Sequence, residues 1–429
     1  MLGYGVARQI FNLDTDAAKY QCYALAFWNG TEALHHLPPL QCSFINHPVQ
    51  GPTPMMRTTI VREMQRLGLP SALVEAVAAQ SSSQPYHALP HEYPLLAVFV
   101  FLPALAAPAA WYQVAFALWM ALVAVAIYLL LLRNAGRGAA LAFVLYLALG
   151  SWVTALTRFD LVPAALTFIA LLCAERARWR WAFVLLALAT MLKFYPLVLV
   201  LPFFIAQQKE DQHRWFSWRR WLPLAAFVAV CALLMLMSLC LSVEGTLGPL
   251  SYFGDRPIQI ESSLASALRL VSAVVNSPLH YAYSFGSRNV SGTLSPIVTR
   301  VGTGVEVAAL LMVYGLQWRG TIRLSLAVLV TLLVVIVTGK VFSAQYLIWL
   351  LPLVAYVGGW RWPWLLGWGS ISLLTTLIYP FIYDRGKYPF GYYLPELHTT
   401  IVVRNVLLLV FTCALVYWGM RSHRRGEVR

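Results

Sequence analysis

The feature that most constrains the fold is a series of ten long apolar runs, each bounded by polar or basic residues. Inside a bilayer every backbone N–H and C=O group needs a partner within the protein, so such runs can span only as helices. Only 11% of the 429 residues are charged, against about 25% in soluble proteins. We therefore predict an all-α polytopic membrane protein. The runs fall at 110–133, 137–155, 161–174, 181–206, 221–243, 301–318, 322–338, 345–359, 363–383 and 401–420.

Basic residues are concentrated in six short connections, which total 44 residues yet hold 16 of the 31 Lys and Arg residues. Cytoplasmic loops of membrane proteins carry such an excess, so the position of the charge explains the net +14 and no nucleic-acid partner is expected. This topology puts residues 1–92, 244–300 and 384–400 outside and the C-terminus in the cytoplasm. The connections are 133–137, 175–180, 207–220, 318–324, 360–362 and 421–429.

The run at 181–206 has basic connections on both sides, so it has to begin and end in the cytoplasm. Two arms of about 12 residues reach roughly 18 Å, which is too short for about 30 Å of hydrocarbon. We predict a hairpin of two short helices with its apex, "MLKFYPL", at membrane depth. About eleven membrane helices of unequal length result.

The chain divides into two parts on this topology. Residues 1–109 form an extracytoplasmic loop with interfacial helices, and 94–106 is too short to span. Residues 110–429 form the transmembrane core, with the outer loop 244–300 inserted in it. Cys22 and Cys42 both face outside, where they could form a disulfide or remain free. No metal-ligand spacing and no internal repeat is visible.

Ionisable residues at the outer ends of the spans are the candidate functional groups, because charge at membrane depth is costly. Arg158 and Asp160 lie two residues apart and could form a local ion pair or serve in catalysis. Lys193 lies at the hairpin apex, from which it cannot snorkel to the inner interface. Arg256 and Glu261, in the outer loop, could equally be solvated charges.

These residues occur in short motifs that are similar to those of the GT-C superfamily of membrane glycosyltransferases. The chain most closely resembles the polyprenyl-phosphate-mannose mannosyltransferases of glycosyltransferase family 87, over nearly its whole length. The motifs are Asp16, Tyr20, Ala24 and Gly30 at the family's spacing, "EYP" at 92–94, "RFDLVPAAL", "LKFYPLVLVLP", "DRPIQIES" and "VFSAQYLIWLLPL". In one respect the sequence departs from the family: only 15 residues precede Asp16, which is too few for the first membrane helix expected there.

The resemblance implies transfer of a sugar, with mannose expected, from a polyprenyl phosphate to a hydroxyl of a glycolipid or glycan at the outer face of a bacterial plasma membrane. Asp16 is the expected general base, with Asp14 as a second candidate. Cations fixed in the cavity would stabilise the phosphate leaving group. Single displacement would invert the anomeric centre, and no metal or cofactor is expected. The candidate phosphate-binding residues are Lys193, Arg256, Lys340 and Arg158, and the candidate substrate-binding residues are Tyr93, Asp160, Gln259, Glu261, Gln345 and Tyr346.

Two other functions fit part of the pattern. A secondary transporter would also carry charges in a cavity, but it should show repeat symmetry and needs no long outer loop with an isolated acid. A lipid-linked glycan ligase or polymerase would also have outer arginines, but it would not be expected to carry the Lys-x-Tyr-Pro hairpin.

Overall fold

The computed structural model describes residues 12–13, 15–46, 57–210, 216–383 and 395–424. The second base candidate, Asp14, lies outside these residues. Within the described chain the fold is almost entirely helical, as predicted. Among the described residues, five helical segments are long and apolar enough to span a membrane, and the protein is an integral membrane protein. They are α7 (Tyr112–Ala135), α13 (Trp218–Leu241), α16 (Ser295–Trp318), α19 (Trp362–Thr376) with the π-turn Leu377–Ile382, and α21 (Pro395–Arg424).

Shorter apolar helices fill the interior of the bundle. Most residues of α17 (Leu324–Thr338) and α18 (Tyr346–Gly358) are buried, whereas only 11% of the apolar stretch of α13, and of α16, is buried. A helix that is apolar all round belongs in such a core. The 15 residues of α17 reach only about 22 Å, less than the roughly 30 Å of hydrocarbon. The other short helices are α8 (Arg137–Tyr146), α10 (Leu161–Ala174), α11 (Trp179–Leu192) and α12 (Val200–Glu210).

The predicted hairpin is confirmed. Helix α11 ends at Leu192, Lys193 is its C-cap in an extended conformation, and a 3₁₀ turn (Tyr195–Leu199) leads into α12. Pro196 lies in the first turn of that 3₁₀ segment and lacks the N–H that a continuous helix would use. The apolar segment after Tyr93 is likewise split into α6 (Leu96–Phe101) and a 3₁₀ turn (Leu102–Ala106), too short to span.

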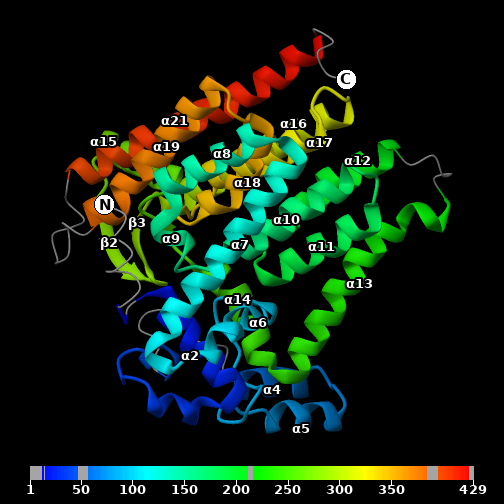
Figure 1. The fold of residues 1–429 in the computed structure, drawn as a ribbon. Helices are drawn as coiled ribbons and strands as arrows, with labels where there is room; N and C mark the ends of the chain where they lie inside the picture. Colours follow the sequence, from blue (N-terminus) through cyan, green and yellow to red (C-terminus); the bar gives the residue numbers. More distant parts are fainter. Residues whose placement is uncertain (1–11, 14, 47–56, 211–215, 384–394, 425–429) are drawn as a thin grey trace.

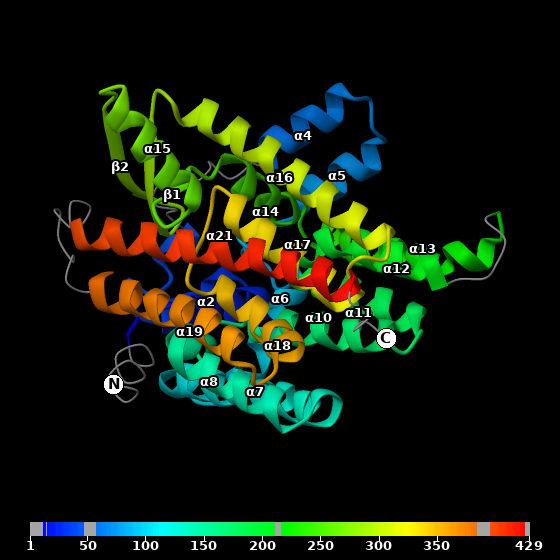
Figure 2. The same ribbon diagram turned by 90° about the horizontal axis from the view of Figure 1, so that it is seen from above.

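The end of the bundle opposite the C-terminal end of α21 is covered by short helices and a small sheet (Figure 1). Strands β1, β3 and β2 pair antiparallel in that order, within the loop 244–300; the sequence did not predict them. Figure 2 shows α19 and α21 running side by side along the bundle, as they also do in Figure 1. The covering elements are α2 (Asp16–Asn29), α4 (Arg57–Arg66), α5 (Ser71–Ala79), α14 (Val243–Asp255), α15 (Ser263–Val274), β1 (Ile258–Gln259), β2 (Leu279–Ser284) and β3 (Ser287–Gly292).

Described residues of all six basic connections meet at the other end of the bundle. A cavity of about 1140 Å³ there is lined by at least one residue from each of them: Asn134, Glu175, Lys209, Arg323, Arg361 and Ser422. The prediction that these connections share one side of the molecule is therefore confirmed.

Candidate active site

A cavity of about 370 Å³ lies at the end of the bundle that carries α2 and the sheet. Its walls come from α2, the segment before α6, the junction of α9 (Trp152–Ala155) and α10, the loop 256–261, the β2–β3 hairpin and the loop before α18. Nine of the predicted site residues line it: Asp16, Tyr93, Arg158, Lys193, Arg256, Gln259, Glu261, Gln345 and Tyr346. Segments separated by more than 300 residues thus meet around one space.

Asp16 is placed by the first turn of α2. Thr15 is the N-cap, and its hydroxyl accepts a hydrogen bond from Ala18 N at 3.1 Å while donating to Gln113 Oε1 of α7 at 2.6 Å. One turn further on, the Tyr20 ring stacks on Phe101 of α6 with centroids 4.3 Å apart. The helix ends at Gly30, whose φ of +81° and approach to Ser83 O leave no room for a Cβ atom. The start and the end of α2 are both fixed.

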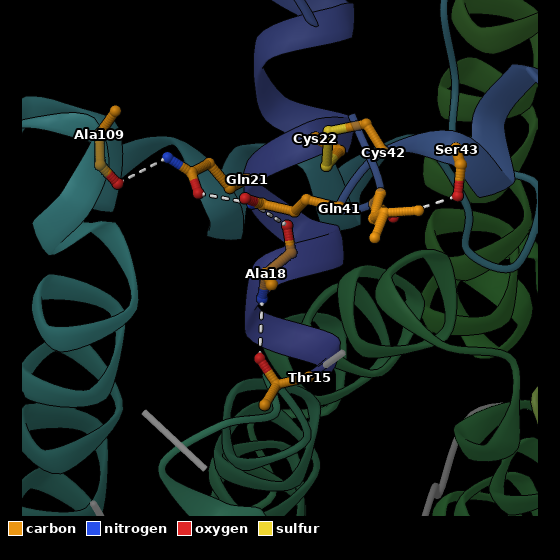
Figure 3. Close-up of a disulfide and its surroundings, with 9 residues drawn as sticks. Thr15, Ala18, Gln21, Cys22, Gln41, Cys42, Ser43 and Ala109 are labelled. Carbon is orange, nitrogen blue, oxygen red and sulfur yellow. Dashed lines mark hydrogen bonds between the residues drawn. A yellow bond between two sulfur atoms is a disulfide. The ribbon is translucent and has the colours of Figure 1, made fainter. Parts of the chain in front are cut away.

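A disulfide and two amide side chains hold the middle of α2 (Figure 3). Cys22 and Cys42 are bonded, which resolves the alternative left open by the sequence. Gln41 Nε2 donates to Gln21 Oε1 at 2.8 Å and to Ala18 O at 3.2 Å, and Gln21 Nε2 donates to Ala109 O at 2.9 Å. These bonds tie the helix that carries Asp16 to the start of the bundle.

Asp16 forms an ion pair with Arg158, and both side chains are largely buried. Burial raises the pKa of the Asp16 carboxyl, but Arg158, Lys19 and Lys193 together lower it further, so its pKa lies below the usual value for Asp. Asp16 is consequently ionised at neutral pH. An ionised carboxylate that lines a cavity can accept a proton.

Lys193 is paired with Asp160 at 2.6 Å, and Trp349 Nε1 donates to the same carboxylate oxygen. The alternative of a local ion pair between Arg158 and Asp160 is not what the structure shows, because each residue pairs with a different partner. Asp160 is fully buried behind Lys193 and does not line the cavity, so its predicted contact with substrate is not supported. Lys193 has a protein partner and also lines the cavity.

Arg256, one of the cations of the cavity wall, has unused hydrogen-bonding capacity. Its guanidinium lies 5.6 Å from the centre of the Tyr252 ring, and Tyr346 lines the same cavity. Its Nε is buried and has no hydrogen-bond partner within the described chain. Gln259 Oε1, three residues further on, is also buried and has no hydrogen-bond partner within the described chain. Buried polar atoms are nearly always satisfied, so these two atoms are available for hydrogen bonds to a ligand in the cavity.

Lys340, a predicted phosphate ligand, is not among the cavity-lining residues. Its Nζ donates to Gly254 O at 2.9 Å, and its own carbonyl accepts from Gln259 N at 2.9 Å. Lys340 therefore stabilises the loop 254–259 without lining the cavity.

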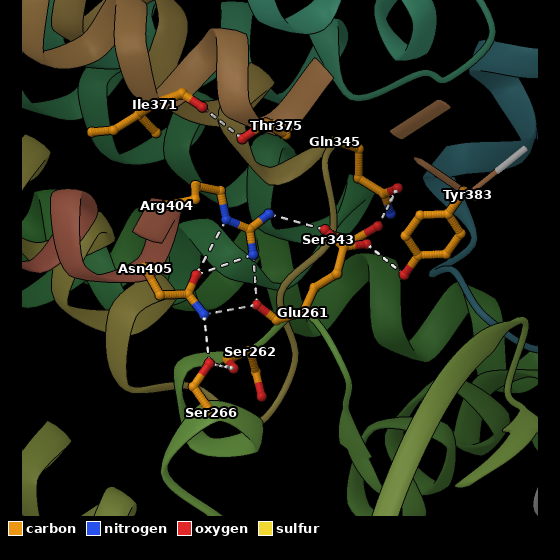
Figure 4. A network of polar contacts seen from close by, with 10 residues as sticks. All are labelled: Glu261, Ser262, Ser266, Ser343, Gln345, Ile371, Thr375, Tyr383, Arg404 and Asn405. Carbon is orange, nitrogen blue, oxygen red and sulfur yellow. Dashed lines mark hydrogen bonds and ion pairs between the residues drawn. The ribbon is translucent and has the colours of Figure 1, made fainter. Parts of the chain in front are cut away.

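Glu261 is neither a solvated charge nor a free ligand for substrate (Figure 4). It is 3% exposed, and its carboxylate accepts from Arg404 Nη1 at 2.9 Å and from Tyr383 Oη at 3.0 Å. Ser343 Oγ donates to Gln345 Oε1 at 3.0 Å on the neighbouring wall. Arg404, which lies inside the apolar run 401–420, was not among the predicted site residues.

Three further charged residues line the cavity and were not predicted from the sequence: Lys19, Glu92 and Arg288. Lys19 lies one helical turn after Asp16, and Glu92 directly precedes Tyr93, so helical spacing and adjacency could have found both. The Cζ atom of Arg288 lies 4.4 Å from the centre of the Tyr383 ring. The unpredicted sheet brings Arg288 to this position.

Comparisons with curated proteins and with solved structures gave no match. The profile of glycosyltransferase family 87 matches residues 91–337, more than half of the chain. The match includes Tyr93, Arg158, Lys193 and Arg256, whereas Asp16 and Arg404 lie outside it. The chain thus belongs to glycosyltransferase family 87 and is a membrane glycosyltransferase.

Proposed function

We propose that this glycosyltransferase moves a mannosyl residue from a polyprenyl-phosphate donor to a hydroxyl group of a glycolipid or glycan. One observation supports the proposal above all others: an ionised carboxylate, Asp16, and a buried unpartnered N–H group of Arg256 line the same cavity. A transfer of this kind needs one group to accept a proton and another to stabilise a developing phosphate charge.

Asp16 is the base in the proposed reaction. Its carboxylate takes the proton of the acceptor hydroxyl while the hydroxyl oxygen forms a bond to the anomeric carbon. The bond from that carbon to the phosphate oxygen breaks, and its electron pair leaves with the polyprenyl phosphate. A single displacement inverts the anomeric configuration, and a positioned base of this type contributes about 10² to 10⁴ in rate.

Arg256 is the principal ligand of the leaving phosphate, with Tyr346 beside it and Arg288 on the facing hairpin. Arg158 and Lys193 contribute positive potential, although their nearest partners are Asp16 and Asp160. The cavity wall carries five cationic side chains, Lys19, Arg158, Lys193, Arg256 and Arg288, against three carboxylates, Asp16, Glu92 and Glu261. This excess favours an anionic donor.

The proposed orientation follows from the two ends of the bundle. The basic connections meet at the end opposite the cavity, and basic loops face the cytoplasm. The cavity then opens on the extracytoplasmic side, covered by the described part of residues 1–109 and by the loop 244–300, with the C-terminus inside. Tyr252, Tyr283 and Phe285 line its wall near Glu92, and aromatic faces beside a carboxylate suit a sugar acceptor.

The donor class is tested with purified protein in lipid nanodiscs, supplied with membrane acceptors and either polyprenyl-phosphate-[¹⁴C]mannose or GDP-[¹⁴C]mannose. We expect radiolabelled glycolipid or glycan with the first donor alone, with an inverted anomeric centre. Transfer from GDP-mannose, or retention of configuration, would contradict the proposal.

A further inference from the structure

We propose that Arg404, in the last membrane helix, is a positioning residue that sets the donor-binding wall of the cavity. The inference rests on the proposed function, because it assigns that wall to the donor phosphate. Arg404 does not line the cavity. It acts through Glu261 and through the loop that carries Arg256 and Gln259.

Arg404 is fully buried and binds Glu261 at two points. Nη1 donates to the carboxylate at 2.9 Å, and Nη2 donates to the backbone carbonyl of the same residue at 2.6 Å. Asn405 completes the contact, since its Oδ1 accepts from Arg404 at 3.0 Å and its Nδ2 donates to Glu261 O at 3.2 Å (Figure 4). A planar guanidinium that bonds side chain and main chain together fixes both the position and the direction of the loop.

The same guanidinium connects several parts of the cavity wall. Its Cζ lies 4.1 Å from the centre of the Phe342 ring, next to the wall residue Ser343. Tyr383, which also lines the cavity, donates to the other oxygen of Glu261. Helix α21 therefore holds the loop 256–261, the loop before α18 and the end of the π-turn after α19 in one arrangement.

The free-energy cost of burying the charged Arg404 side chain indicates a role beyond packing. Arg404 is the tenth residue of a long apolar helix, where a charged side chain is expensive to insert and an apolar residue would pack at lower cost. The ion pair does supply orientation, and the residues it orients include Arg256 and Gln259, whose buried polar atoms are available for hydrogen bonds to a ligand. Small displacements of such groups are costly, since a misplacement of about 1 Å can reduce a rate about a hundredfold.

The test compares Arg404→Lys and Asn405→Leu with wild type, using purified protein and polyprenyl-phosphate-mannose. Lysine keeps the charge next to Glu261 but cannot reproduce the fork, and Asn405→Leu removes the second contact without changing charge. We expect Arg404→Lys to raise the KM for donor about tenfold or more, with kcat changed less and the acid limb of the pH profile unmoved, because Asp16 is untouched. Asn405→Leu should raise the donor KM by a smaller factor in the same direction.

Thr412→Val is the matched control, because Thr412 is a buried residue of the same helix whose hydroxyl donates to Leu408 O, one turn back. It should leave KM and kcat unchanged. Wild-type kinetics in Arg404→Lys, or a lower thermal stability of both test variants with unchanged kinetics per folded molecule, would overturn the positioning role alone. Absence of turnover by the wild-type protein with this donor would overturn the proposed function and this role with it.

Discussion

At the scale of single residues, the charge state of Asp16 is set by its neighbours. Burial raises the pKa of this carboxyl, and Arg158 makes the largest opposing contribution. A base with a lowered pKa stays ionised as the pH falls, so the acid limb of kcat/KM should lie below the ordinary range for Asp.

Arg158→Met is expected to move that limb to higher pH, because the desolvation of Asp16 persists while its main counter-ion is lost. The measurement is kcat/KM for mannosyl transfer as a function of pH. Lys340→Met serves as the control and should leave the limb in place. A limb that stays fixed in Arg158→Met would show that Asp16 is not the group that titrates.

The division of roles between Arg256 and Lys340 gives a second prediction. Arg256→Met removes the unpartnered N–H group from the cavity, whereas Lys340→Met removes a side chain that bonds Gly254 O outside it. Loss of a charged donor to phosphate should cost about 2 to 3 kcal/mol, or roughly 30- to 160-fold in kcat/KM. We expect Lys340→Met to stay within about threefold of wild type by steady-state kinetics. The reverse order would place the phosphate at Lys340.

Most of the charged residues of the cavity could be predicted from the sequence, because motifs with charges at span ends are informative even when their partners are unknown. The partners could not be predicted. Asp160 looked like a substrate ligand, but it pairs with Lys193 across 33 positions of the chain. In the sequence, Arg404 is a charged residue inside the apolar run 401–420. Its partner, Glu261, is brought to it only by the packing of α21 against the loop 256–262.

At the scale of elements, the hairpin of α11 and α12 depends on the ion pair at its apex. Lys193→Met would leave Asp160 buried without its counter-ion, which should destabilise the fold by about 3 to 5 kcal/mol. The measurement is thermal unfolding of the detergent-solubilised protein. The double variant Lys193→Met/Asp160→Asn, which buries no charge at this site, should recover most of the loss. A single variant as stable as wild type would mean that water or another cation already serves Asp160.

The helical elements were predictable because apolar runs and basic connections are strong signals, and the hairpin followed from its two basic flanks alone. The small sheet was not predictable from the sequence. Its strands β2 and β3 have no sustained apolar alternation, and their pairing with β1 joins segments some 30 residues apart. For that reason the sequence did not predict that Arg288 lines the cavity.

At the scale of the whole molecule, the account requires the cavity and the basic connections to lie on opposite sides of the membrane. Leu67, between α4 and α5, is 75% exposed at the cavity end, and Phe216, before α13, is 97% exposed at the other end. In a background without the free cysteines, Leu67→Cys should react with an impermeant maleimide in intact cells, and Phe216→Cys only after permeabilisation. The opposite pattern would place the cavity in the cytoplasm and exclude the proposed orientation.

The central claim is that Asp16 removes the proton from the acceptor while the cavity holds a polyprenyl-phosphate sugar. The most direct test is to measure both donor binding and mannosyl transfer for Asp16→Asn, a change that keeps the shape of the side chain and removes the proton acceptor. We predict donor affinity within about threefold of wild type and a loss of about 10² to 10⁴ in kcat. Transfer at the wild-type rate by Asp16→Asn would contradict the account.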